Sequence, residues 1–286
     1  MTVTPLTWLY APGDRPQVVA KALHSGADVV LVDLEDAVAP ERKAYARAAT
    51  AELLADPSPG PVPVHVRVNA LDGPLAEDDV RALAPLPGLA ALRLPKVTSP
   101  ADIARVAGWS AGAAPLYALL ESALGVERAY EIATCHRAVR GIALGEADLR
   151  ADLGVPEGDG GLAYARGRAV LAARAAGLAP PPQSVYPDIR DLAGLAASCA
   201  EGKAAGFLGR AAVHPRQLAV IERAYRPTAR EVERAEQVVR AAETGAGALA
   251  LPDGRFVDPA VVAGARRTLR LAARGRGGCL LYPSPT

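Results

Sequence analysis

Charged side chains recur in this 286-residue chain at the points where short apolar runs end. The run Asp33-Leu34-Glu35-Asp36 places three carboxylates in four positions, and Glu121 and Asp148 follow two later apolar runs. If Glu121 and Asp148 come together, they suit Mg²⁺, which takes oxygen ligands and keeps other positions for water or substrate. Without a metal, two close carboxylates repel and one retains a proton. These residues indicate a divalent-metal site, with helix capping, above all by Asp148, as the structural alternative.

Three basic side chains also stand at the ends of apolar runs. Arg67 inside a strand is costly unless it faces an anion, and an ion pair with Asp33–Asp36 is its structural alternative. Lys96 could form a Schiff base, the metal-free route to aldolase chemistry, or it could pair with nearby carboxylates. His214 could act as a base, although a histidine hydrogen-bonded to the backbone is the commoner arrangement. On residue types alone, both metal-dependent and Schiff-base chemistry stay open.

The elements that must position these groups alternate between apolar runs and helical stretches. The apolar runs are continuous, as in parallel strands covered on both faces. Eight strands are predicted, at Thr7–Tyr10, Val29–Asp33, Val64–Val68, Ala91–Leu94, Leu116–Leu120, Gly141–Leu144, Gln183–Val185 and Ala211–His214. Helices are predicted between them at Arg15–Ser25, Pro40–Ala55, Ala101–Gly108, Leu124–Thr134, Leu162–Ala176 and Ile189–Ala205. This alternation predicts an α/β fold of the (β/α)₈ TIM-barrel type, with a doubly wound open sheet as the competing architecture.

Further helical stretches follow the eighth predicted strand. They are expected at Pro215–Tyr225, Thr228–Glu243 and Pro259–Ala273, and the Gly/Pro-rich tail Gly275–Thr286 is expected to be irregular. Asp258 and Pro259 resemble an N-cap followed by a proline at the first helical position. We therefore expect a TIM-barrel catalytic domain over residues 1–226 and a C-terminal helical extension, or lid, over residues 227–286.

Composition excludes several classes of partner. Lys and Arg number 32 against 31 Asp and Glu, for a net charge of +1, so no basic surface for nucleic acid is expected. The apolar runs are too short to cross a membrane, and no secretory signal is seen at the N-terminus. Cys135, Cys199 and Cys279 lie far apart without metal-type spacing. We expect a cytoplasmic protein with reduced thiols that binds neither nucleic acid nor membrane.

An ordered set of motifs identifies a family. From about residue 6 to about residue 272 the chain resembles the citrate lyase β-subunit family, which is related to the malyl-CoA lyases and the HpcH/HpaI aldolases. The resemblance rests on Leu9-Tyr10-Ala11-Pro12-Gly13-Asp14-Arg15-Pro16, Ser25-Gly26-Ala27-Asp28, Asp33-Leu34-Glu35-Asp36-Ala37-Val38-Ala39-Pro40 with Lys43 and Arg47, Arg67-Val68-Asn69, Leu94-Pro95-Lys96-Val97, Leu119-Leu120-Glu121-Ser122, Gly145 through Asp148, Asp152-Leu153-Gly154, Val213-His214-Pro215-Arg216-Gln217 and Gly254-Arg255-Phe256-Val257-Asp258-Pro259.

The resemblance implies a citryl-CoA lyase-like carbon–carbon lyase. Its barrel would act with Mg²⁺ on CoA or acyl-carrier thioesters of 3-hydroxy acids, releasing a 2-oxo acid such as oxaloacetate or glyoxylate and acetyl-CoA. It implies Glu121 and Asp148 as metal ligands, Arg67 against the thioester or keto oxygen, and the backbone of Gly145, Glu146 and Ala147 around the substrate carboxylate. Asp258 would be a general acid/base that reaches a neighbouring subunit's site in a homotrimer or hexamer. The CoA phosphates would need a cation such as Arg15 or Lys43.

Two alternatives stay open beside this lyase. A metal-dependent pyruvate aldolase acting on free 4-hydroxy-2-oxo acids would share the barrel and the Glu/Asp pair. A β-subunit active only within a citrate lyase-type complex would share the whole pattern. The family often reads Gly-Ala-Glu-Asp-Leu where this chain has Gly145-Glu146-Ala147-Asp148-Leu149, and lysine is common where it has Arg210. The first departure leaves citryl and malyl thioesters both open.

Overall fold

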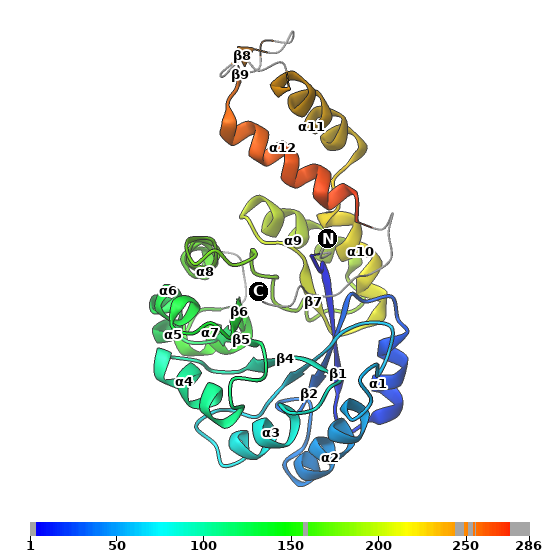
Figure 1. The fold of residues 1–286 in the computed structure, drawn as a ribbon, viewed down its shortest axis with the longest axis vertical. Coiled ribbons are helices and arrows are strands. Elements are labelled where there is room, and N and C mark those ends of the chain that lie inside the picture. Colours follow the sequence, from blue (N-terminus) through cyan, green and yellow to red (C-terminus); the bar gives the residue numbers. More distant parts are fainter. Residues whose placement is uncertain (1–3, 157–159, 244–248, 251–253, 255, 275–286) are drawn as a thin grey trace. The chain divides into compact units, whose positions relative to one another are not determined.

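The computed structural model describes residues 4–156, 160–243, 249–250, 254 and 256–274 (Figure 1). Two compact units make up the chain. The larger is Pro5–Ala224, and the smaller runs from Tyr225 onward and includes Thr4. Whether they act as catalytic domain and lid stays a prediction.

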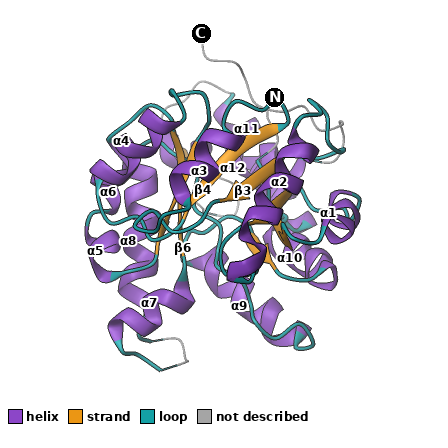
Figure 2. Ribbon diagram, turned by 90° about the horizontal axis from the view of Figure 1, so that it is seen from below, coloured by secondary structure: helices purple, strands orange, loops and turns teal. Residues whose placement is uncertain are grey.

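A seven-stranded, all-parallel sheet forms the centre of the larger unit, and Figure 2 shows the helices around it. Its strands are β1 (Thr7–Pro12), β2 (Val29–Asp33), β3 (Val64–Arg67), β4 (Leu89–Leu94), β5 (Leu116–Leu120), β6 (Val139–Leu144) and β7 (Arg210–Ala212). The order β6-β5-β4-β3-β2-β1-β7 follows the chain in one direction and then joins the last strand to the first. A doubly wound sheet would instead reverse direction at an internal strand, so that alternative is wrong.

The seventh predicted strand, Gln183–Val185, is the main correction to the predicted barrel. Within the described residues this segment makes one isolated bridge, from Gln183 to Arg210, and no ladder with β6. Pro180–Pro182 and Pro187 flank it and have no N–H groups to donate. The Ser184 hydroxyl instead donates to the Leu144 carbonyl at 2.5 Å. The sheet is therefore a curled, seven-stranded barrel-like arrangement rather than a complete (β/α)₈ ring.

The helices of the larger unit mostly fall where they were predicted. They are α1 (Pro16–Leu23), η1 (Pro40–Arg42), α2 (Lys43–Leu54), α3 (Ala76–Leu83), α4 (Pro100–Trp109), α5 (Ala123–Glu127), α6 (Ala129–Thr134), α7 (Glu146–Leu153), α8 (Ala163–Ala175), α9 (Leu192–Ala204), η2 (Pro215–Gln217) and α10 (Leu218–Tyr225). The predicted helix Leu124–Thr134 breaks at Arg128. Helices α3 and α7 were not predicted. Only Leu149 of α7 is buried, so its sequence has no apolar stripe.

The smaller unit pairs two helices. They are α11 (Ala229–Ala242) and α12 (Pro259–Ala272), joined through the antiparallel pair β8 (Leu249–Ala250) and β9 (Phe256–Val257). Ala235, Val238, Val257 and Ala265 form its core. The tail Gly275–Thr286, which was expected to be irregular, lies outside the described residues. In the described part of the chain, each helix is too short or too polar to cross a membrane.

Candidate active site

A fixed ion pair joins the ends of β2 and β3. Asp33 and Arg67 are register partners on these parallel strands, so their side chains emerge at the same carboxyl edge of the sheet. Arg67 donates to both oxygens of Asp33, at 2.7 Å from Nε and 2.6 Å from Nη2. The same carboxylate accepts the N–H groups of Glu35 and Ala37, each at 3.0 Å. Because Asp33 is only 1% exposed, this bidentate pair holds the guanidinium in one orientation.

Two further carboxylates surround Arg67. Its Nη1 lies 2.9 Å from a Glu35 oxygen and donates to Asp36 at 3.1 Å. Its guanidinium also lies over the Tyr10 ring, 5.3 Å from the ring centre. Burial opposes its charge, but the hydrogen bonds and charge of Asp33 raise the pKa of Arg67 above its usual value. The ion pair with Asp33–Asp36, the structural alternative for Arg67, is present, and the catalytic role of Arg67 stays a prediction. The site thus contains a permanent cation in a fixed orientation.

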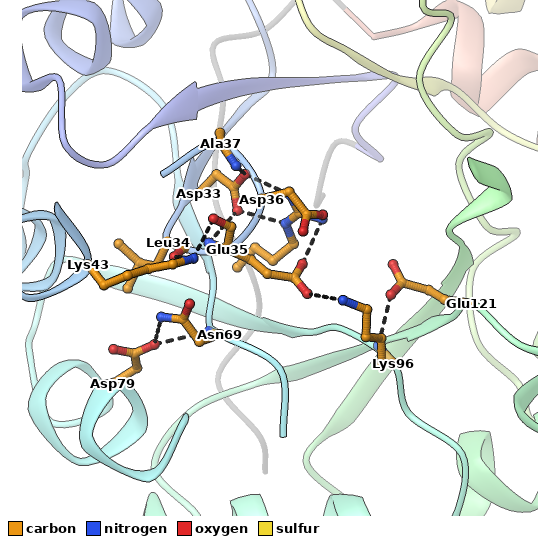
Figure 3. Close-up of polar contacts among 11 residues, drawn as sticks. Asp33, Leu34, Glu35, Asp36, Ala37, Lys43, Asn69, Asp79, Lys96 and Glu121 are labelled. Carbon is orange, nitrogen blue, oxygen red and sulfur yellow. Dashed lines mark hydrogen bonds and ion pairs between the residues drawn. The ribbon is translucent and has the colours of Figure 1, made fainter. Parts of the chain in front are cut away.

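Lys96 occupies the end of β4 and pairs with Glu35. Its ammonium lies 2.9 Å from a Glu35 oxygen, and this hydrogen bond raises the pKa of Lys96 (Figure 3). A Schiff-base lysine needs the opposite shift, toward a neutral amine. The ion-pair alternative for Lys96 is therefore the one that the structure supports. Its backbone has φ +53°, an uncommon conformation for a residue other than glycine, and its N–H donates to Glu121 at 3.0 Å.

Glu121 follows β5 and is 5% exposed. Burial, and then the negative charges of Glu35 and Asp148, raise its pKa to about 8. A Cβ atom on Gly145 would overlap the Glu121 carboxylate, so glycine at this position leaves room for the side chain as it lies here. The Glu121 carboxylate is therefore largely removed from the water that would stabilise its charge, and it packs against the backbone of Gly145.

Asp148 stands in the first turn of α7, directly after β6. It is exposed, and its charge acts on both Glu121 and Lys96. The N-cap of α7 is Gly145, so the alternative in which Asp148 caps this helix is wrong. Farther along α7, Asp152 accepts the N–H of Ala123 at 2.7 Å and ties this helix to the start of α5.

Glu121 and Asp148 together fit a hard divalent cation. Both offer carboxylate oxygens, and burial together with the charges of Glu35 and Asp148 raises the pKa of Glu121, an effect that a bound cation would oppose. Among the described residues no cluster of three or more His, Cys, Asp or Glu could hold a metal. A pair of carboxylates with remaining positions for water or substrate oxygens matches Mg²⁺ rather than a structural zinc site.

The burial of Glu121 predicts how stability depends on pH without metal. The folded protein keeps this proton up to about pH 8, whereas an ordinary carboxyl releases it near 4.5. The free energy of unfolding should therefore fall as pH rises between these values, by at most about 1.4 kcal/mol per pH unit. Glu121→Gln should remove this slope. Urea unfolding in the presence of a chelator, at several pH values, measures the free energy of unfolding of both proteins. If this free energy depends on pH in the same way in wild type and variant, Glu121 does not have the raised pKa.

The start of α7 lies beside the Glu121 carboxylate, and two of its backbone N–H groups have acceptors within the chain. Gly145 N–H donates to the Leu120 carbonyl at 3.1 Å, and Glu146 N–H lies 3.3 Å from the Ser184 hydroxyl. The N–H of Ala147 follows in the turn that a helix leaves without intrahelical partners, where an anion binds favourably. The Glu146 carboxylate accepts hydrogen bonds from Nε and Nη2 of Arg166, at 2.9 and 2.7 Å. The predicted carboxylate-binding role of Gly145, Glu146 and Ala147 stays a prediction.

The other predicted residues have identifiable structural contacts. His214 Nδ1 accepts the Arg216 N–H at 3.1 Å, which is the backbone-bonded alternative for this histidine. Lys43 donates to the carbonyls of Leu34 and Glu35 at 2.8 and 2.6 Å, so it supports the acidic loop. Asp258 belongs to the smaller unit, where it caps α12 by accepting the Val261 N–H at 2.8 Å, as predicted.

Sequence reasoning missed the residues that hydrogen-bond to the loops and helix start of the site and hold them in place. Asp79 of α3 is fully buried and accepts the Asn69 backbone and side chain at 3.0 and 2.6 Å, and Arg47 at 2.9 Å. This fixes the loop after β3. Ser184 and Arg166 likewise hold the start of α7 from distant parts of the chain. Their only sequence signal is a polar residue inside an otherwise alanine-rich or proline-rich stretch.

Buried carboxylates and a fixed cation at one edge of a parallel α/β sheet are features of an enzyme active site. Comparison of the sequence with family models makes this assignment more specific. Residues 6–215 match the HpcH/HpaI aldolase/citrate lyase family, and the chain belongs to this family.

Individual relatives match over nearly the whole chain. Citrate lyase subunit beta of Leuconostoc mesenteroides subsp. cremoris is 34% identical, covering 93% of this chain and 92% of its own. A (3S)-malyl-CoA thioesterase of Cereibacter sphaeroides is 36% identical, covering 92% and 93%. The crystal structure of protein CitE from Mycobacterium tuberculosis with magnesium, acetoacetate and coenzyme A is 33% identical with a TM-score of 0.81, covering 94% of this chain and 98% of that one.

Proposed function

We propose that the protein is a Mg²⁺-dependent carbon–carbon lyase for 3-hydroxyacyl thioesters of the citryl-CoA or malyl-CoA type. The products of cleavage are a 2-oxo acid, oxaloacetate or glyoxylate, and acetyl-CoA, and the same site could catalyse the reverse condensation. One observation carries the proposal. The Glu121–Asp148 pair lies at the same sheet edge as Arg67, a cation whose orientation is fixed by Asp33.

The relatives support this choice of ligands. The CitE structure contains magnesium, an oxo acid and coenzyme A together, in a protein that covers 94% of this chain. The names citrate lyase subunit beta and (3S)-malyl-CoA thioesterase concern the two acyl groups that the sequence leaves open. We therefore propose Glu121 and Asp148 as the Mg²⁺ ligands and the first turn of α7, Gly145 to Ala147, as the site of the substrate carboxylate.

The reaction breaks the bond between the hydroxyl-bearing carbon and the carbon next to the thioester. The hydroxyl loses its proton to solvent and becomes the new carbonyl group of the 2-oxo acid, and the bond electrons form a thioester enolate. The enolate carbon takes up one proton in the next step, so no net proton is released or consumed. Bound Mg²⁺ would supply chelation of the hydroxyl and adjoining carboxylate, which lowers the hydroxyl pKa. Arg67 balances the enolate charge, because it stays protonated and does not need to reorient.

The enolate carbon then takes a proton to give the acetyl thioester. We propose Asp258 as the group that delivers this proton, and that removes it in the condensation direction. The residue lies in the smaller unit, and the proposal places it at the site of a neighbouring subunit in a homotrimer or hexamer. Asp258 caps α12, so a role in catalysis has to be separated from a role in folding.

Incubation with citryl-CoA and malyl-CoA in the presence of Mg²⁺ tests the function. NMR is expected to show oxaloacetate or glyoxylate together with acetyl-CoA, and EDTA should stop their formation. Free citrate or malate with CoA would mean thioester hydrolysis instead. Pyruvate and an aldehyde from a 4-hydroxy-2-oxo acid, without thioester cleavage, would mean the aldolase. Turnover only with an acyl-carrier protein would favour a subunit of a larger complex.

The variant Asp258→Asn refines this assay. Asparagine caps a helix about as well as aspartate, so α12 should begin as before while the carboxylate is lost. Turnover should fall with near-normal affinity for oxaloacetate, because the proton transfer is affected and binding is not. An Asp258→Asn enzyme with full turnover would remove Asp258 from the proposed mechanism.

A further inference from the structure

We propose that Arg166 is a positioning residue that keeps the Glu146 carboxylate away from the anion-binding turn of α7. This inference rests on the proposed function and concerns how the same turn can accept a substrate carboxylate. Arg166, on α8, binds both oxygens of Glu146 at 2.9 and 2.7 Å. The two side chains are 18% and 15% exposed, so the pair is shielded from water on most sides.

Glu146 is the residue whose charge would oppose the substrate. It is the first residue of α7, and Asp148, whose charge acts on Glu121, lies two positions later. A flexible carboxylate at a helix N-terminus is attracted to the free N–H groups of the first turn. It would compete there with a substrate carboxylate and add a third negative charge near the metal ligands. The planar fork of Arg166 neutralises that charge and fixes its direction.

Other contacts hold α7 in place independently of Arg166. Ser184 joins the Glu146 N–H to the Leu144 carbonyl at the start of the helix. Near the other end, Asp152 binds the Ala123 N–H. Removal of the guanidinium should therefore release the Glu146 side chain without unfolding the helix. The expected loss is electrostatic, which distinguishes it from a general loss of structure.

Four proteins test the inference: wild type, Arg166→Met, the double variant Arg166→Met/Glu146→Gln, and Arg168→Met. Calorimetry measures binding of oxaloacetate in saturating Mg²⁺. Arg166→Met should weaken binding on the order of 10-fold to 100-fold, as expected for one unscreened charge in a partly buried site. The double variant should recover most of that loss, because the released charge is gone. Arg168→Met is the matched control on the same helix, where a guanidinium donates to the Glu127 carbonyl at 2.9 Å, and it should bind normally.

Salt adds a second readout that a structural defect would not produce. Between about 0.1 M and about 1 M salt the Debye length falls from about 10 Å to about 3 Å, so part of the Arg166→Met loss should disappear. Unchanged binding in Arg166→Met, or a double variant as weak as the single one, would overturn the inference. If wild type itself binds no oxo acid with Mg²⁺, the proposed function fails first. Normal wild-type binding with an insensitive Arg166→Met rejects the role of Arg166 alone.

Discussion

Replacing Glu121 and Asp148 together by alanine is expected to abolish Mg²⁺-dependent binding of a 2-oxo acid. The two carboxylates are the proposed protein ligands, and the described residues contain no larger cluster that could take over. We expect a loss of at least about 100-fold in affinity, because Mg²⁺ sites with few protein ligands depend on each carboxylate. Either single variant should lose most of the same affinity, since one remaining ligand cannot chelate the cation.

Titration calorimetry with oxaloacetate, in Mg²⁺ and in EDTA, measures this loss. Glu52→Gln on the exposed face of α2 removes a carboxylate far along the chain from both residues and serves as the matched control. Thermal melting in EDTA should show that Glu121→Ala is at least as stable as wild type near pH 7, because a carboxylate with a raised pKa is removed. Unchanged Mg²⁺-dependent binding in the double variant would reject the metal assignment.

Replacing Arg67 by methionine is expected to have the second large effect, on both turnover and stability. Loss of the enolate's counter-charge should lower kcat on the order of 10²-fold to 10³-fold, as for removal of an oxyanion-binding donor. The variant also leaves Asp33 buried without its partner, which should cost about 3–5 kcal/mol of unfolding free energy. Steady-state kinetics and urea unfolding measure the two losses separately.

The double variant Arg67→Met/Asp33→Asn separates the structural effect from the catalytic one. Asparagine removes the orphaned charge at nearly constant volume, so much of the lost stability should return. Turnover should stay low, because no cation replaces the guanidinium. Recovery of turnover together with stability would show that Arg67 acts only by holding the acidic loop in place. The turnover of Arg67→Lys is expected to lie between those of wild type and Arg67→Met, because lysine keeps the charge but lacks the planar guanidinium.

Most of the sheet could be predicted because its strands are short apolar runs, covered on both faces. Residues 29–32 are fully buried, and the predicted bounds of β2 and β5 agree with the structure. The seventh strand could not be predicted reliably. Gln183–Val185 has a composition that a strand end can have. The prolines around it, however, lack the backbone N–H groups that pairing with a neighbouring strand needs. The segment's hydrogen bonds to Leu144 of β6 and to Glu146 of α7 come from one hydroxyl, that of Ser184, which no local pattern reveals.

The sequence predicted many of the individual site residues but few of the side-chain contacts that join them. Residues at strand ends, such as Asp33 and Arg67, meet because parallel register brings them side by side, and that pairing was expected as an alternative. Helix α7 was missed because it has several acids and one buried side chain, although it begins at the centre of the site. Contacts such as Arg166 to Glu146 join different helices, and nothing in the spacing of a single sequence specifies them.

The central claim is that Glu121 and Asp148 hold a divalent cation beside the first turn of α7, and anomalous diffraction tests it most directly. Crystals soaked with Mn²⁺ in place of Mg²⁺, together with oxaloacetate, would locate the cation by its anomalous signal. We expect one strong peak bonded to both carboxylates, with the oxo acid on the same ion and its carboxylate at Ala147. A cation bound elsewhere, or an oxo acid that binds in the larger unit without either carboxylate, would contradict it.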